Sequence, residues 1–182
     1  YLVEVATPEL SPLEIAPMLL GQVEYAFRLK LPDQLTSGLR AYCDRVGITE
    51  KFHSLVLGGK ELKPGIDEYA KLEGNDWYIQ RPDNYWKSNM HWISPGGEDA
   101  QLSYLKALGE NGFDEVLEAV GNQLGLDGLV CYHLTFIGVS YSQKSYIHYD
   151  FTKTGAKAYN VIIPLLLANE TPPELDIRAD DE

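Results

Sequence analysis

One histidine and one aspartate near the end of the sequence have the types and the spacing of a metal-ligand pair. His148 and Asp150 are separated by one residue within SYIHYDF, residues 145–151, where alternating side chains predict a β-strand. Side chains two positions apart on a strand point to the same face, so the imidazole and the carboxylate would converge, with Tyr149 on the other face. One nitrogen and one oxygen donor are two of the three ligands of a 2-His-1-carboxylate site for non-haem Fe(II).

The pair alone is not specific, because four histidines and 27 acidic residues among 182 positions make one such match common by chance. Its surroundings add a family resemblance. Residues 134–177, LTFIGVSYSQKSYIHYDFTKTGAKAYNVIIPLLLANETPPELDI, resemble the first half of the catalytic core of Fe(II)/2-oxoglutarate-dependent dioxygenases, nearest to the prolyl-hydroxylase-like branch. NVIIPLLLAN (160–169) resembles the family's apolar strand after the H-x-D strand, and PPEL (172–175) stands where Gly-Gly-Glu often lies. A helix predicted over residues 113–126 matches the helical support before the family's barrel.

The resemblance implies an oxygenase that hydroxylates an unactivated C–H bond of a small molecule or of a protein or peptide substrate. It implies that His148 and Asp150 are the catalytic metal ligands. Tyr141 and Tyr146 occupy roughly the places of the family's aromatic residues before the histidine, and Asn160 begins the next strand. We therefore expect Tyr141, Tyr146 and Asn160 to help bind the cosubstrate. The implied cofactors are Fe(II) and 2-oxoglutarate, and the resemblance also allows ascorbate.

The sequence departs from the family after this segment. Family members carry a second ligand histidine well beyond the aspartate, followed by a basic residue that binds 2-oxoglutarate. No histidine follows His148, and Arg178 is the only basic residue near the end. Three interpretations stay open. The sequence is part of a longer enzyme, the second half of the core is a separate polypeptide, or the protein is a degenerate relative without iron that acts as a binding or assembly scaffold.

The helices that position this pair are predicted from hydrophobic periodicity. Residues 32–47 and 113–126 have apolar side chains at helical spacing, and residues 100–112 form a shorter helix ending at glycine. Asp33 is expected as the N-cap of the first helix and Gly47 directly after its last turn. The expected apolar faces of the two longer helices are Leu35, Leu39, Tyr42 and Val46, and Phe113, Val116, Leu117, Val120 and Leu124.

Strands are predicted mainly in the last third of the chain, over residues 128–142, 145–151, 157–168 and 173–177. Residues 1–6 alternate like a strand, residues 11–27 combine a short helix with a strand ending at Phe27, and residues 58–100 read as a long loop with at most one short strand. Helices followed by antiparallel strands indicate an α+β fold of one domain. We expect a helical and loop-rich support over residues 1–127 and a partial double-stranded β-helix, jelly-roll or cupin-like, over residues 128–182.

Other residues with chemical potential have structural interpretations. His133 is expected as a packed core residue on the 128–142 strand, and His91 in an aromatic loop, with a pocket mouth as its alternative. Cys43 and Cys131 are too far apart for a CxxC pair, and two buried free thiols are favoured over a disulfide. Arg81 and the loop from Trp77 to Trp92 are candidates for shaping a substrate entrance.

The composition disfavours two classes of binding partner. The formal net charge of −12 and the absence of any cluster of more than two Lys or Arg disfavour nucleic acid and anionic membranes. The apolar run YNVIIPLLLAN is too short to span a bilayer, and the sequence begins at Tyr1 without a signal-like segment. Apolar residues occupy both faces of the predicted strand 157–168, which is typical of a strand covered on both sides. We therefore expect the remaining half of the β-core to come from the same or an associated chain.

Overall fold

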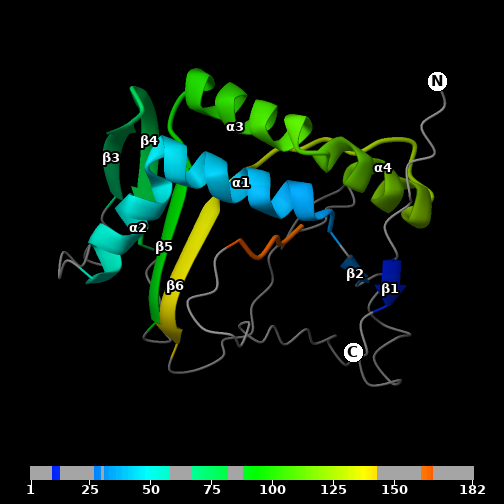
Figure 1. The fold of residues 1–182 in the computed structure, drawn as a ribbon, viewed down its shortest axis with the longest axis horizontal. Coiled ribbons are helices and arrows are strands. Elements are labelled where there is room, and N and C mark those ends of the chain that lie inside the picture. The colour runs from blue at the N-terminus through cyan, green and yellow to red at the C-terminus, as the bar shows by residue number, and fades with distance from the viewer. Residues whose placement is uncertain are drawn as a thin grey trace.

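The computed structural model describes residues 10–12, 27–29, 31–57, 67–81, 88–142 and 161–165. Helices and antiparallel strands combine in an α+β fold, which confirms the predicted class (Figure 1). The elements in chain order are β1 (Leu10–Pro12), β2 (Phe27–Leu29), α1 (Asp33–Val46), α2 (Ile48–Leu57), β3 (Asp67–Leu72), β4 (Asn75–Gln80), β5 (Ser88–Pro95), α3 (Glu98–Glu110), α4 (Phe113–Leu124) and β6 (Phe136–Ser142). Among these helices none is both long and apolar enough to cross a membrane.

A four-stranded antiparallel sheet of order β3-β4-β5-β6 is the largest element of the described residues. Strands β3 and β4 form a hairpin through Glu73 and Gly74, whose φ angles of 48° and 81° suit the tight turns that match sheet twist. The prediction of a long loop over 58–100 was wrong, because β3, β4 and the whole of β5 lie there. The sequence of β3 shows little hydrophobic alternation, because its outward residues, such as Asp67 and Lys71, are charged and exposed.

The helices pack against one face of this sheet, which we call the inner face and define by the buried residues Trp77, Ile79, Ile93 and Phe136. Helix α3 contacts both β4 and β5, and α1 lies beside α3 (Figure 1). An aromatic stack joins the layers: the ring centroid of Tyr104 lies 4.4 Å from that of Phe136, and the Tyr42 and Tyr104 centroids are 5.8 Å apart. One core therefore links α1, α3 and β6.

The predicted helix over 32–47 is confirmed as α1, and its expected apolar face is buried in full: Leu35, Leu39, Tyr42 and Val46. Pro32 occupies the N-cap position, so the assignment of Asp33 as N-cap was wrong. Asp33 instead begins the first turn, where a carboxylate interacts favourably with the helix dipole. Gly47 ends the helix with φ 87°, and its N–H donates to the carbonyls of Cys43 and Asp44, as expected of a glycine there.

The two later helices also match their predictions. Helix α3 begins at Glu98, two residues before the predicted start, and α4 covers Phe113–Leu124. On α4, Phe113, Val116 and Val120 are buried as expected, and Leu117 is half-buried. Helix α2 was missed, because only Gly47 separates it from α1 and the expected helix signal ends at that glycine.

Several strand predictions need correction. Of residues 128–142 only Phe136–Ser142 form a strand, and Ser11 and Pro12 lie in β1 where a helix was expected. Phe27 lies in β2 as predicted. Residues 161–165 are neither helix nor strand, which contradicts a strand there; Pro164 has no N–H for a ladder. Residues 1–6, 145–151 and 173–177, also predicted as strands, lie outside the described part.

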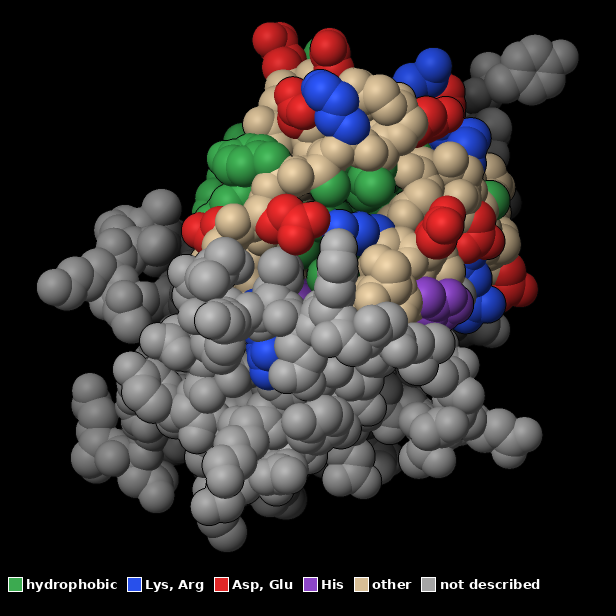
Figure 2. All heavy atoms as spheres, turned by 90° about the vertical axis from the view of Figure 1, so that its left-hand side faces the viewer, with side chains coloured by type: hydrophobic (Ala, Val, Ile, Leu, Met, Phe, Trp, Pro, Cys, Tyr) green, Lys and Arg blue, Asp and Glu red, His purple; other side chains and the backbone are tan. Residues whose placement is uncertain are grey.

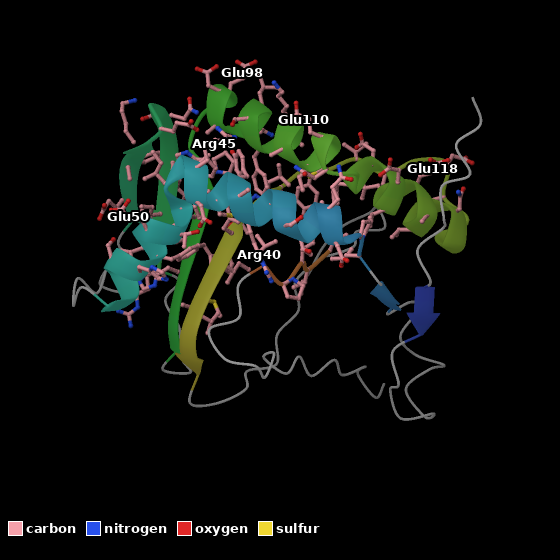
Figure 3. All side chains as sticks on the ribbon, in the orientation of Figure 1. Arg40, Arg45, Glu50, Glu98, Glu110 and Glu118 are labelled. Carbon is pink, nitrogen blue, oxygen red and sulfur yellow. The ribbon has the colours of Figure 1, made fainter. Side chains whose placement is uncertain are left out.

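The segment 161–165 nevertheless adds to the core. Ile163 and Leu165 are half-buried and pack against the residues of the hydrophobic core. The Arg40 guanidinium of α1 donates a hydrogen bond from Nε to the Leu165 carbonyl. Figure 3 shows Arg40 pointing from α1 toward this segment, whereas Glu98, Glu110 and Glu118 lie around the outside of α3 and α4. Helix α1 thus contacts, through Arg40, a segment of the chain that follows the H-x-D pair.

Candidate functional site

Most of the predicted site residues lie outside the described residues: His148, Asp150, Tyr146 and Asn160. Tyr141 lies in β6, where its Cα pairs with Asn89 beside a shift of register between Asn89 and Met90. Strand β6 ends at Ser142, so the predicted strand 145–151 begins only three residues later. The structure therefore describes the strand that leads to the candidate metal ligands, and the site is built outward from it.

Strand β6 has a buried side and an exposed side. Phe136 and Gly138 face the helices, and a Cβ atom built on Gly138 would overlap the ring of Phe52 from α2. Ile137 and Val139 alternate with them on the opposite face and are 55% and 51% exposed. The outward side chains of Ile137 and Val139, in the strand that precedes the H-x-D pair, are thus apolar and accessible.

The neighbouring strand extends this exposed surface. Directly opposed residues of an antiparallel ladder share a face, and Val139 and Ile137 oppose Met90 and Trp92. The Trp92 indole Nε1 lies 3.2 Å from the Met90 sulfur and donates to it, which holds these half-buried side chains together. We call the surface formed by Met90, Trp92, Ile137 and Val139 the outer apolar patch.

The other half of the same face is polar. Asp67, Lys71 and Asp76 stand on the outward side of the β3–β4 hairpin, and the Lys71 Nζ lies 2.7 Å from an Asp76 carboxylate oxygen. Tyr69 and Tyr78 are opposed there, with ring centroids 5.2 Å apart. Figure 2 shows acidic and basic side chains intermixed over the described atoms at this side of the molecule. The polar half needs no cover, whereas the outer apolar patch is the part of the face that would gain from burial.

The two described histidines of the sequence analysis lie in other places than predicted. His91 stands in β5 opposite Gly138, is completely buried and faces the helices, so its assignment to a loop or pocket mouth was wrong. His133 is exposed and outside any strand, so its assignment to the core was also wrong. His133 lies outside the sheet because the pairing of β5 with β6 begins at Ile93 and Phe136, and the residues that precede Phe136 in the chain are not paired.

Both cysteines are free thiols, as favoured from the sequence. Cys43 is buried, and burial, with the neighbouring Asp44, raises its pKa to about 12. Cys131 is exposed rather than buried as expected, although its remaining burial still raises its pKa. Its sulfur donates to the His133 carbonyl across 3.6 Å. Since a thiolate is the nucleophilic form, neither thiol is activated for covalent catalysis near neutral pH.

Three tyrosines have raised pKa values for different reasons. Burial raises the pKa of Tyr104 and of Tyr42, whose hydroxyl donates to Ser103 across 3.2 Å. The pKa of Tyr78 is raised to about 12, mainly by its hydrogen bond to Asp67. All three stay protonated at neutral pH, so none of them is a general base there.

The expected substrate entrance is only partly described. Both ends of the expected loop from Trp77 to Trp92 are strands, β4 and β5, so the prediction of one continuous loop was wrong. Trp77 is completely buried in the core, so it does not line an entrance. Arg81 is half-buried directly after β4, and residues 82–87 lie outside the described part. The sequence missed the outer apolar patch, because its members come from two strands and only the register between β5 and β6 brings them together.

Within the described ranges no three His, Cys, Asp or Glu side chains are placed to share a metal ion. Comparisons with protein-family models, with curated proteins and with solved structures find no match to this chain. The family resemblance therefore rests on the sequence of residues 134–177.

Proposed function

We propose that this chain carries the metal-binding part of an Fe(II)/2-oxoglutarate-dependent oxygenase that hydroxylates an unactivated C–H bond. The observation that carries the proposal is the pair His148 and Asp150 in a segment of alternating side chains that begins three residues after β6. One imidazole and one carboxylate on the same face of a strand are a donor set that suits Fe(II).

The arrangement of layers supports this proposal. A sheet that is covered by helices on one face and apolar on part of the other would be stabilised by a second layer over that part. We propose that this layer is the other sheet of a double-stranded β-helix, to which residues 145–151 belong. Ile137 and Val139 would then lie inside the sandwich, and the metal ligands would be enclosed between the two sheets.

The roles of the chain's own residues follow from their chemistry. His148 would provide an imidazole nitrogen and Asp150 a carboxylate oxygen, and both must be unprotonated to bind. Tyr146, on the same face of its strand as His148, would contact the cosubstrate together with Tyr141 and Asn160. When bound, Fe(II) and 2-oxoglutarate supply O₂ activation coupled to decarboxylation of the cosubstrate. The outer apolar patch would exclude water from the space beside the ligands.

The remaining ligand histidine and the basic partner of 2-oxoglutarate would come from the other half of the core, in the same polypeptide or an associated chain. This half would also complete the walls of the site. The substrate would be a small molecule or a peptide.

The proposal is tested by Fe(II)-dependent turnover of 2-oxoglutarate in the intact protein. We expect His148→Ala and Asp150→Ala to abolish the turnover, because each removes a metal ligand. His133→Ala is the matched control, since His133 is exposed and outside the predicted ligand set. Turnover that survives His148→Ala would contradict the assignment. Intact protein that neither binds iron nor consumes 2-oxoglutarate would instead favour a non-catalytic binding scaffold.

A further inference from the structure

One side chain of the helical layer holds a segment that follows the candidate metal ligands. The Arg40 guanidinium of α1 donates from Nε to the carbonyl of Leu165, which lies 125 residues further along the chain. Leu165 ends the described segment 161–165, and this segment directly follows Asn160 in the sequence. The hydrogen bond therefore joins α1 to the part of the chain that carries a predicted contact to the cosubstrate.

The segment 161–165 depends on side chains for its position. Its residues belong to no helix or strand, and Pro164 has no N–H to donate. Ile163 and Leu165 are half-buried and pack against the core. Apolar packing is non-directional, so it keeps these side chains near the core without fixing the backbone in one place. Within the described part of the chain, the hydrogen bond from Arg40 is the one that joins this backbone to a helix.

Arg40 is well placed on α1 for this contact. Its neighbour Leu39 is buried in the core, whereas Arg40 itself is exposed and can reach a segment that lies beside the helix. Asp44 lies four positions later on α1, where oppositely charged side chains often pair. No ion pair joins Arg40 to Asp44 among the described residues, and the guanidinium contacts the distant carbonyl instead. A charged donor forms a stronger hydrogen bond to a carbonyl than a neutral donor does.

We infer that Arg40 is a positioning residue for the proposed oxygenase, because it fixes the segment that places Asn160 for contact with 2-oxoglutarate. The inference rests on the proposed function, in which Asn160 helps to bind the cosubstrate. Arg40 acts through the backbone of residues 161–165 and touches neither the metal nor the cosubstrate. Without its hydrogen bond the segment samples other arrangements, and 2-oxoglutarate binds only to the fraction of molecules in the competent one.

Two substitutions of similar length separate the hydrogen bond from the charge. Counted along the side chain, the amide nitrogen of glutamine stands at the position of the arginine Nε, and the terminal methyl group of methionine stands there without a donor. Arg40→Gln therefore keeps an N–H for the Leu165 carbonyl and loses the charge, whereas Arg40→Met loses both. Arg45→Met is the matched control, because Arg45 lies on another side of α1 and pairs with Glu73 across 2.9 Å (Figure 3).

The test measures the affinity of the intact, iron-loaded protein for 2-oxoglutarate, together with its iron content. Arg40→Met should weaken 2-oxoglutarate binding by about three- to tenfold and leave the iron content unchanged, because the metal ligands are intact. Methyl NMR of Ile163 follows the segment without any cosubstrate, and its order parameter should fall in Arg40→Met. Arg40→Gln should restore most of the affinity and of the order, and Arg45→Met should match the wild type in both.

Three results would overturn the inference and leave the proposed function standing. The first is an Arg40→Met protein that binds 2-oxoglutarate as tightly as the wild type. The second is a loss of affinity without any change at Ile163, which would mean that Arg40 does not act through the segment. The third is an Arg40→Gln protein as weak as Arg40→Met, which would assign the effect to the charge.

Failure of the proposed function has a different signature. A wild-type protein that binds no 2-oxoglutarate after iron loading would contradict the proposed function and the positioning role together, and it would do so before any variant is made. Because Arg40 is exposed, its variants should retain the fold, and their melting curves check this.

Discussion

The two faces of the sheet differ in what covers them. On the inner face Trp77, Ile79 and Ile93 are completely buried, with α3 packed on β4 and β5. On the outer face Ile137 and Val139 are more than half exposed, although they stand on the same strand as the buried Phe136. The inner face belongs to a hydrophobic core, whereas the outer face carries exposed apolar side chains without a described layer over them. The proposed function depends on a second layer that covers these side chains.

The largest effect should come from separating residues 1–182 from the proposed second half of the core. Each large aliphatic side chain left exposed forgoes roughly 1.5–3 kcal/mol, against a typical total stability of about 5–15 kcal/mol. We expect residues 1–182 produced alone to aggregate, which light scattering and calorimetry would detect. A soluble monomer that melts cooperatively would contradict the need for a second layer and would favour the non-catalytic scaffold.

The next prediction compares the faces within the intact protein. Ile137→Ala should destabilise it by about 2 kcal/mol or more if the proposed sheet buries this side chain. At its present exposure of 55% the same substitution would cost little, within about 0.5 kcal/mol. Urea denaturation of the intact wild type and variant separates the two values. A negligible change would mean that no second layer covers β6.

A smaller loss of stability is expected from adding a side chain at Gly138, on the inner face of the sheet. Gly138→Ala adds a Cβ atom that would overlap the Phe52 ring, and overpacking of this kind costs about 1–3 kcal/mol. Gly128→Ala is the matched control, because nothing lies within 4 Å of the Cβ atom it would add. Chemical denaturation of the two variants compares them, and equal stabilities would show that α2 does not pack closely on β6.

Alkaline pH should affect the buried thiol and the exposed thiol differently. Burial raises the pKa of Cys43 from 9.0 to about 12, so the folded state keeps a proton that the unfolded chain releases. The stabilisation linked to this group is therefore fully present below pH 9.0 and is lost as the pH rises toward about 12. Stability should fall over this range, and less steeply in Cys43→Ala. Alkylation of the native protein should label Cys131 well before Cys43, and equal rates would contradict the burial of Cys43.

Prediction from the sequence succeeded for elements whose hydrophobic pattern can be read without knowing which element they pack against. The apolar stripe of Leu35, Leu39 and Tyr42 identified α1, because helical periodicity needs no knowledge of a partner. Strand β3 was missed, since its outward residues are charged and its inward residues, such as Ala70, are only half-buried. Residues 128–135 were overpredicted, because strand-like composition does not reveal whether a neighbouring strand is present.

The candidate site likewise has one part that lies within a single element and one part that depends on the pairing of two strands. The pair His148 and Asp150 could be found from the sequence, because its two members are separated by one residue on a single predicted strand. The outer apolar patch could not be found, because Trp92 and Ile137 meet only through the register of β5 and β6. Cross-strand neighbours depend on pairing that a single sequence does not encode locally.

The most direct test of the central claim, that His148 and Asp150 hold one metal ion, is the iron content of the protein after anaerobic loading with Fe(II) and removal of excess metal. We predict one iron per intact molecule, lost in His148→Ala and in Asp150→Ala and retained in His133→Ala. Residues 1–182 alone should retain none, because two protein ligands leave most of the coordination sphere to exchangeable water. Iron that persists in both ligand variants, or an intact wild-type protein that retains none, would contradict the account.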